Sequence, residues 1–348
     1  MSKKKKKEDK IKIRRRKRTR SVLSGIFNSF IAVVSISALI LFIIVLIGKM
    51  SEVDKSAFNN VSSKLFTNFN KNEVGGDGNL IVDPDVPIIY FDRDGNNELL
   101  FKICIMSDIH NDKENLAKSI IMIKETGCEK LFVLGDLTDY GDVESLKDIR
   151  SILDSSGIEY YAIPGDHDIA DSLSAENFNK VFGIDYHIME YEGVVFLLID
   201  NSANFTEIGN IQMSWIEDNI GNADFVVMSQ PLFTEGLNPP FSSTYMGSMP
   251  SAPESDDIRE KQQYVKEQRD FLLDLIRKND NVRATIAGDH HRSSDLSDPV
   301  RSELFHYVVG AVTSTVNDFP QTAIQSSRFS VLSFYKGGSY DLEDILLD

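Results

Sequence analysis

Five short segments of the chain place Asp, His or amide side chains directly after strand-like runs. They are residues 107–110, 135–136, 165–168, 229–231 and 288–291. In open α/β sheets, ligands bind in the crevice outside the carboxyl ends of the strands. One crevice could therefore receive side chains from positions about 180 residues apart. Clustered carboxylates and imidazoles are the ligands that metal-assisted hydrolysis requires, so the pattern predicts a metal-bound hydrolase site.

The elements that would carry these segments alternate along the chain. We expect helices over residues 113–126, 142–156, 174–181, 210–220 and 260–279. We expect strands over residues 88–92, 99–106, 130–135, 158–163, 186–191, 194–200, 224–229, 282–287, 304–312 and 329–335. The first two strands would pair across an Asp94-Gly95 turn. The alternation predicts an α/β fold, and the hairpin and late strands indicate a mixed sheet or a second one.

Composition divides the chain into a membrane-proximal part and one globular domain. Residues 49–86 are polar and are interpreted as a stalk or linker. Residues 87–348 are long enough for one substantial core. Within them, residues 234–259 hold four prolines and interrupt the order of elements. A loop of that length is usually functional or disordered, so it is interpreted as a lid beside the site or a disordered surface excursion.

The ordered set of five segments resembles the calcineurin-like metallophosphoesterases. Their motifs run Asp-x-His, Gly-Asp-x-x-Asp-x-Gly, Gly-Asn-His-Asp, His-x-Pro and Gly-His-x-His. This chain has Asp108-Ile109-His110, Gly135-Asp136 to Gly141, Gly165 to Asp168, Ser229-Gln230-Pro231 and Gly288 to His291. The similarity covers roughly residues 99–292. It implies a β-sandwich of two mixed sheets flanked by helices, and a phosphate-ester substrate.

The resemblance implies one intact metal site and one altered site. The first would use Asp108, His110, Asp136 and His291, all present here. In the second, Asp136 would bridge to the other ion. The family's Asn is replaced by Asp166, its His by Ser229 (or by Gln230 if the register shifts), and the first His of the last motif by Asp289. Alternatively, His290 could become a ligand through a local rearrangement.

The two sites would favour different cations. Oxygen ligands such as Asp166 and Asp289 suit Mg²⁺, Ca²⁺ or Mn²⁺, with Mn²⁺ or Mg²⁺ favoured, whereas imidazole suits Zn²⁺ or Fe. Two divalent ions about 3.5–4 Å apart could acidify a bridging water and bind both the attacking and leaving oxygens. The resemblance makes His167 the group beside the leaving oxygen, oriented by Asp139. A carboxylate partner favours the protonated imidazole that a general acid requires.

Tyr140 stands where the protein phosphatases of this superfamily carry arginine. Loss of that phosphate clamp argues against a phosphoprotein phosphatase. His187 and His306 lie in strand-like runs and are interpreted as structural. Three functions remain open: a metal-dependent phosphoesterase, a catalytically weak relative that binds a ligand or envelope partner, and a nuclease or pyrophosphatase on the same fold.

The amino-terminal residues predict a membrane anchor. Residues 1–20 hold thirteen Lys or Arg, and residues 21–48 carry no charge. A run of about 20 apolar residues can cross a bilayer as a helix. The positive-inside bias would keep the basic tail cytoplasmic and place the domain outside the membrane. A cleaved signal peptide is the main alternative, but no Ala-x-Ala-like site follows before Lys49. A buried core helix is disfavoured because the run lacks amphipathic periodicity.

The net charge of the domain limits the partners it can bind, and the positions of its two cysteines bear on whether they form a disulfide. Of the chain's 37 basic and 53 acidic residues, 24 and 51 lie after residue 20, a net charge of −27. So acidic a domain is not expected to bind nucleic acid. Cys104 lies within a predicted strand and Cys128 just before the next one. We therefore expect two buried thiols rather than a disulfide.

The predicted topology is a single-pass anchor with the domain outside the membrane. Protease added to intact cells should remove the domain and spare the basic tail, as followed by immunoblotting against each end. Permeabilised cells provide the control in which both parts are digested. A domain that stays protected until permeabilisation would contradict the topology.

Overall fold

The structure is a computed structural model that describes residues 89–91, 98–238, 241–248, 255–313 and 325–347. It divides into two units, Met1–Ile81 and Val82–Asp348, and every described element lies in the second. The predicted basic tail, the membrane helix over residues 21–48 and the linker over 49–86 lie outside the described residues. Within the described ranges, no helix has both the length and the apolar character that crossing a bilayer demands.

The first of two six-stranded sheets has the order β1-β12-β11-β2-β3-β4. Its strands are β1 (Ile89–Phe91), β2 (Leu99–Met106), β3 (Lys130–Leu134), β4 (Glu159–Ile163), β11 (Arg328–Tyr335) and β12 (Tyr340–Leu346). The strands β2, β3 and β4 are parallel, whereas β1, β12 and β11 form antiparallel pairs and β11 pairs antiparallel with β2. The sheet is therefore mixed, and its parallel half carries the first three motif segments.

The second sheet has the order β5-β6-β7-β8-β10-β9. Its strands are β5 (His187–Tyr191), β6 (Val194–Ile199), β7 (Phe225–Met228), β8 (Ala284–Ala287), β9 (Ser294–Ser297) and β10 (Phe305–Val308). The run β6-β7-β8-β10 is parallel, and antiparallel strands complete both edges. The two remaining motif segments follow β7 and β8.

Helices cover the outer face of each sheet. Their bounds are α2 (Lys113–Thr126), α3 (Val143–Ser155), α4 (Glu176–Phe182), α5 (Asn210–Asn219) and α6 (Asp256–Lys278), with 3₁₀ turns at His167–Ile169, Ile220–Asn222 and Phe241–Ser243. The side chains of Asp112, Asp142 and Ser255 accept hydrogen bonds from backbone N–H groups in the first turns of α2, α3 and α6. Such caps satisfy donors that a helix start otherwise leaves unpaired.

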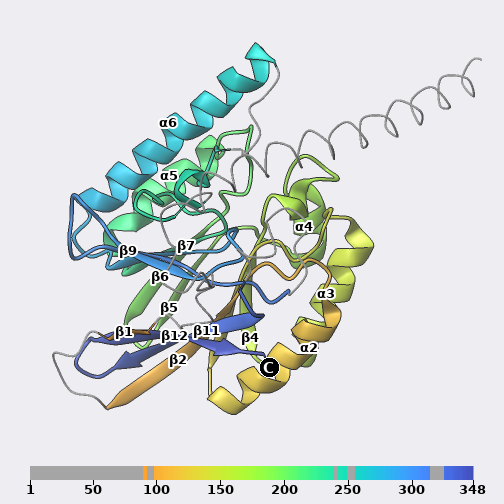
Figure 1. Ribbon diagram of the computed structural model, residues 1–348, viewed down its shortest axis with the longest axis vertical. Helices are drawn as coiled ribbons and strands as arrows, with labels where there is room; N and C mark the ends of the chain where they lie inside the picture. Colours follow the sequence, from red (N-terminus) through yellow and green to blue (C-terminus); the bar gives the residue numbers. More distant parts are fainter. Residues whose placement is uncertain (1–88, 92–97, 239–240, 249–254, 314–324, 348) are drawn as a thin grey trace, which may run out of the picture. The chain divides into compact units, whose positions relative to one another are not determined.

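Alternating side chains of the strands build a layered core. On β2, Cys104 and Met106 face α2, α3 and α4, whereas Ile103 and Ile105 face the second sheet. A third apolar cluster joins the second sheet to α5 and α6. Figure 1 shows α2 and α3 on the side of the domain opposite to α5 and α6. The prediction of two mixed sheets flanked by helices is confirmed.

Three predicted details of the sheets and helices differ from the structure. The strand β1 pairs with β12, not with β2 across the Asp94-Gly95 turn. The strands β9 and β12 were not predicted, because their polar residues mask the alternation of a half-buried strand. The helix α6 begins at Asp256 rather than residue 260, since Ser255 caps it and two aspartates follow in its first turn.

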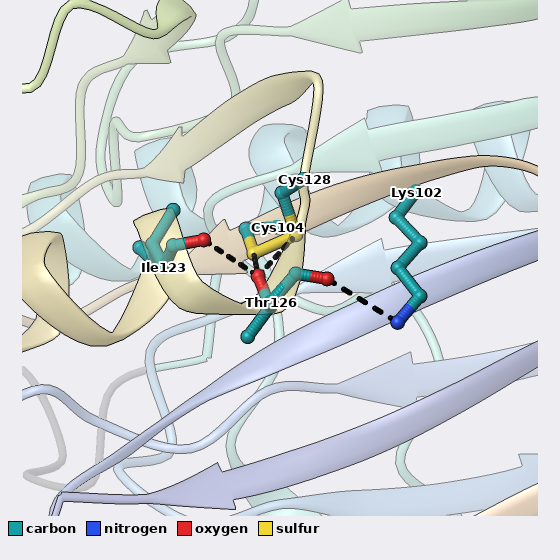
Figure 2. The surroundings of a disulfide bond; sticks show 5 residues. All are labelled: Lys102, Cys104, Ile123, Thr126 and Cys128. Carbon is teal, nitrogen blue, oxygen red and sulfur yellow. Dashed lines mark hydrogen bonds between the residues drawn. A yellow bond between two sulfur atoms is a disulfide. The ribbon is translucent and has the colours of Figure 1, made fainter.

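The prediction of two thiols is wrong, because Cys104 and Cys128 form a disulfide (Figure 2). Gly127 ends α2 in the left-handed conformation, with φ of 76°. This turn reverses the chain and brings the Cα of Cys128 to 5.6 Å from that of Cys104 on β2. The hydroxyl of Thr126 donates to the carbonyl oxygen of Ile123 and lies 3.1 Å from the Cys128 sulfur. The positions of the two cysteines along the chain did not reveal that they lie close together in the fold.

Replacing both cysteines by serine should lower the free energy of unfolding by about 2–4 kcal/mol, because the bond closes a loop in the unfolded chain. Urea denaturation of the full-length chain, followed by circular dichroism, measures the change. Reductant should destabilise the wild type toward the double variant and leave the variant itself unaffected. Equal stability of the two proteins without reductant would contradict a bond that constrains the unfolded state.

Candidate metal centre

All five motif segments meet where parallel strands of the two sheets end. Residues 107–110, 135–136 and 165–168 follow β2, β3 and β4, while residues 229–231 and 288–291 follow β7 and β8. Backbone bonds join neighbouring segments, with Asp108 N donating to Gly135 O at 3.2 Å and Gly288 N donating to Ser229 O at 2.9 Å. The N–H of Asp289 donates to Asp108 Oδ2 at 3.2 Å and so connects the two sheets. The predicted crevice is thus a junction between sheets.

The backbone at this junction adopts an uncommon conformation. Eight non-glycine residues among those described have positive φ, and six of them lie here: Asp108, His110, Asn111, Asp136, Asp289 and His291. Left-handed backbone disfavours most side chains, and its strain collects at functional sites. The concentration of such residues at one crevice indicates that the fold is organised around these side chains.

Two motif glycines make room for the polar groups. A Cβ on Gly165 would lie 2.0 Å from Asp136 Oδ1, and one on Gly288 would lie 1.9 Å from Ser107 Oγ. Neither approach is possible for a larger residue. The glycines before Asp166 and Asp289 therefore allow close packing of the strand ends.

The four residues of the predicted first site converge on a single point. Asp108, His110, Asp136 and His291 each offer a ligand atom, and these atoms lie within 4.8 Å of one another. The Nε2 atoms of His110 and His291 are 3.1 Å apart, and His291 Nε2 lies 3.3 Å from Asp108 Oδ1. His110 Nε2 lies 3.8 Å from Asp136 Oδ2. The arrangement can hold one cation between two imidazoles and two carboxylates.

Burial keeps the two imidazoles neutral and disfavours the charged form of Asp108. It raises the pKa of Asp108 to about 7, and it lowers the pKa of His110 to about 4 and of His291 to about 3. The imidazoles are therefore neutral at neutral pH, as metal ligation requires. The Oδ1 atom of Asp108 is buried and accepts no hydrogen bond within the described ranges. A divalent cation would supply the missing partner, so the residues fit a metal ion.

Asp136 also belongs to a second group, with Asp166 and His167. Burial, followed by the charges of Asp166 and Asp108, raises the pKa of Asp136 well above its usual range. The pKa of Asp289 is raised by burial and by the same two carboxylates. Four acidic side chains therefore share one buried region, and Asp136 stands between the two groups. The resemblance implied that Asp136 would bridge two ions, and that role stays a prediction.

Asp139 makes three contacts in the structure, rather than the single contact with His167 that was predicted. Its backbone carbonyl lies 3.0 Å from His167 Nδ1, whereas its carboxylate Oδ1 lies 3.3 Å from His110 Nδ1. Its Oδ2 accepts a hydrogen bond from Asn111 Nδ2 at 3.1 Å. Such an outer carboxylate fixes the ring of a ligating histidine and raises its basicity. The main-chain carbonyl can orient His167, and the carboxylate can orient His110.

The remaining motif residues have distinct positions. Ser229 and Gln230 are buried and are both bonded to Asn201. His290 does not join either cluster, since its Nε2 lies 2.8 Å from the carbonyl oxygen of Thr244 and its ring lies against Phe241. His290 thereby fastens the described start of the predicted lid, residues 234–238 and 241–248, to the motif segment.

Asp168, for which no role was predicted, connects two motif segments. Its carboxylate accepts hydrogen bonds from the N–H groups of Gly165, Leu137 and Thr138 and from the hydroxyl of Thr138. These bonds, at 2.9 to 3.1 Å, fix the loop after β4 against the loop after β3. Its place directly after His167 in the motif was the available signal. Asn201 and Asn204 lie outside the motifs, so no comparable signal marked them.

A family model described as calcineurin-like phosphoesterase matches residues 101–293, more than half of the chain. The chain belongs to this family. The match spans every motif segment and ends just after His291. Metal-dependent hydrolysis of phosphate esters is the chemistry that the family and the Asp/His cluster support. Among curated proteins, none has a sequence that matches this chain.

Several solved structures resemble this calcineurin-like phosphoesterase at low identity. A dimetal phosphatase from Danio rerio is 14% identical over 72% of this chain and 100% of its own, with a TM-score of 0.47. A purple acid phosphatase from yellow lupin is 12% identical over 73% of this chain and 52% of its own, with a TM-score of 0.49. GAP50, the anchor in the inner membrane complex of Plasmodium, is 12% identical over 72% and 86%, with a TM-score of 0.48.

His167 lies where it could either donate a proton or bind a metal, and substitution separates these roles. If it is the general acid, His167→Ala should lower kcat by roughly 10²–10⁴ and leave the metal content unchanged. Aryl esters with good leaving groups should lose less rate than alkyl esters. Kinetics paired with metal analysis measures both, and His187→Asn, outside the clusters, is the control. Loss of one bound ion would instead make His167 a ligand.

Proposed function

We propose that the chain hydrolyses phosphate mono- or diesters with two divalent cations that share Asp136. The main support is that Asp136 belongs to two candidate ligand groups. The first also contains Asp108, His110 and His291, and the second also contains Asp166 and His167. A shared carboxylate is what a two-metal hydrolase needs, because it sets the spacing of the ions. The charges of Asp166 and Asp108 both raise the pKa of Asp289, which would complete the acidic side of the second site.

The residues of the chain divide the work of such a reaction. Bound divalent ions would supply an acidified water and positive charge for the phosphate oxygens. Asp136 would be a ligand of both ions, and His110 and His291 would provide neutral imidazole ligands to the first one. His167 faces the same crevice, its ring 4.7 Å from that of His110, and donates a proton to the leaving oxygen. The carbonyl oxygen of Asp139 holds that ring in place.

The ligand types favour different metals at the two positions. Two imidazoles with two carboxylates suit Zn²⁺ or Fe, as at the first site. Asp166, Asp289 and an oxygen from Ser229 or Gln230 would instead make a hard, oxygen-rich site for Mn²⁺ or Mg²⁺. Activity should therefore depend most strongly on the metal offered to the second position.

We also propose that the domain lies outside the cell membrane, with residues 21–48 as its anchor. The basic tail and the uncharged segment support this topology. The Cys104–Cys128 disulfide supports it independently, because such bonds persist in oxidising compartments and are rare in the cytosol. The substrate would then be a phosphate ester met at the outer surface, and the acidic domain disfavours nucleic acid.

Asp136→Asn provides the decisive test, because it replaces the one carboxylate that both ligand sets share by a neutral amide of similar size. The full-length chain in detergent is assayed for bound metal and for mono- and diester hydrolysis with Mn²⁺, Mg²⁺, Ca²⁺ and Zn²⁺. The wild type should be most active with Mn²⁺ or Mg²⁺, and the variant should lose metal and at least ~10²-fold in rate. Asp218→Asn, exposed on α5, is the matched control.

Two results would overturn the proposal. Activity of Asp136→Asn within a few-fold of wild type would remove the bridging role. One tightly bound ion, with no turnover under any metal, would favour the alternative of a catalytically weak relative that binds a ligand or an envelope partner. In that case, restoring the family pattern with Asp166→Asn, Ser229→His and Asp289→His should create activity from a silent background.

A further inference from the structure

A pair of side-chain amides connects the second site to the loop after β6. Asn204 Nδ2 donates to Asp166 Oδ2 at 2.8 Å. On its other side, Asn204 Oδ1 accepts a hydrogen bond from Gln230 Nε2 at 3.1 Å. Asn204 belongs to none of the five motif segments and so carried no prediction from the sequence. It bridges two residues proposed for the second site.

The carboxylate of Asp166 fixes the direction of this chain of hydrogen bonds. An ionised carboxylate only accepts hydrogen bonds, so Asn204 must turn its NH₂ group toward Asp166. The carbonyl of Asn204 then points the other way and requires a donor, which Gln230 supplies with its own NH₂ group. A second acceptor, the backbone oxygen of Ser202, lies 3.4 Å from the same nitrogen. The amide of Gln230 is therefore held in one of its two orientations.

That orientation leaves the carbonyl oxygen of Gln230 without a partner. Gln230 is 3% exposed, and its Oε1 atom accepts no hydrogen bond within the described part of the chain. A buried, unsatisfied acceptor costs about 1–3 kcal/mol. Buried polar groups without a hydrogen-bond partner are rare in native proteins, and a bound ion is one explanation for such a group. The unpaired oxygen thus points to a ligand.

The main chain around Gln230 is held firmly next to the second site. Asn201 Oδ1 accepts from the backbone N–H groups of Ser229 and Gln230, and Asn201 Nδ2 donates to Gln230 O at 2.7 Å. The carbonyl oxygen of Ser229 accepts from Gly288 N, one residue before Asp289. Gln230 is therefore connected to Asp289 through the backbone and to Asp166 through Asn204.

The same contacts distinguish Gln230 from Ser229 as the ligand in this segment. The hydroxyl of Ser229 donates to Asn201 Oδ1 at 3.1 Å and so takes part in the clamp on the backbone. The amide oxygen of Gln230 takes part in no such bond. A neutral amide oxygen is also a ligand that Mg²⁺, Mn²⁺ and Ca²⁺ accept readily.

We propose that Gln230 Oε1 is an oxygen ligand of the second cation and that Asn204 is the positioning residue that aims it. This inference rests on the proposed function, since it requires the second cation site. By bonding Asp166 and Gln230 at once, Asn204 fixes the spacing of two ligands from different sheets. Its role is to set the affinity of the second ion rather than to touch the substrate.

Metal titration of the full-length chain tests the proposal. Calorimetry and the electron paramagnetic resonance of bound Mn²⁺ should resolve two ions in the wild type. Asn204→Ala and Gln230→Met should each weaken the second ion by about 10–100-fold, the usual effect of removing an outer partner or a ligand. Affinity for the first ion should stay within about threefold. Asn281→Ala, an exposed asparagine bonded to Gly221 O, is the control.

The double variant tests whether Asn204 acts through Gln230. If it does, the two substitutions together should weaken the second ion by less than the product of their separate effects. A second-ion affinity unchanged in either single variant would overturn the proposal, as would a wild type that binds one ion. These outcomes are read from binding, so a chain that binds two ions and hydrolyses no ester refutes the proposed function while leaving this inference intact.

Discussion

The structure depends on the burial of several carboxylates around Asp136. Burial and mutual repulsion raise the pKa of Asp136 and Asp289, so this arrangement opposes folding unless positive charge compensates it. No Lys or Arg contacts Asp136 among the ion pairs found in the described ranges. Divalent cations are the counter-charge that explains why the fold maintains left-handed backbone at Asp108 and Asp136 and close glycine contacts beside them.

The residues of the candidate metal centre come from both sheets, and the spacing within each sheet explains part of its geometry. The first sheet supplies Asp108, Asp136 and Asp166 from adjacent parallel strands, so their spacing follows from the distance between strands. The second sheet supplies Gln230 and Asp289. Hydrogen bonds between side chain and backbone, such as Asp289 N to Asp108 Oδ2, hold the two sets in register. The packing of Phe and Ile side chains between the sheets therefore sets the distance across the site.

The sequence predicted the parts of this design that depend on local pattern. Apolar runs ending in Asp108, Asp136 and Asp166 marked the strand ends, because strand periodicity and motif order are readable along the chain. Contacts between segments that are far apart in the sequence could not be predicted from local pattern. The pairing of β1 with β12 joins the start and end of the domain, and the disulfide arises from a reversal at Gly127 that brings two separated residues together. Asn204 lies in no motif. Its contacts with Asp166 and Gln230 form only in the folded chain, so the sequence could not reveal them.

At the proposed second site, Asp166 and Asp289 stand where the motifs of the family carry an asparagine and a histidine, which would change the charge that the site must balance. Each aspartate adds a negative charge that a neutral amide or imidazole would not, and both act on the pKa of Asp136. As a ligand, the uncharged amide oxygen of Gln230 would add no further repulsion, which another carboxylate would do. Asn204 fits the same logic, because its NH₂ group offsets part of the charge on Asp166 while its carbonyl orients Gln230. A neutral amide ligand would therefore add affinity for a hard cation. It would not increase the repulsion between the acidic site and an anionic phosphate ester.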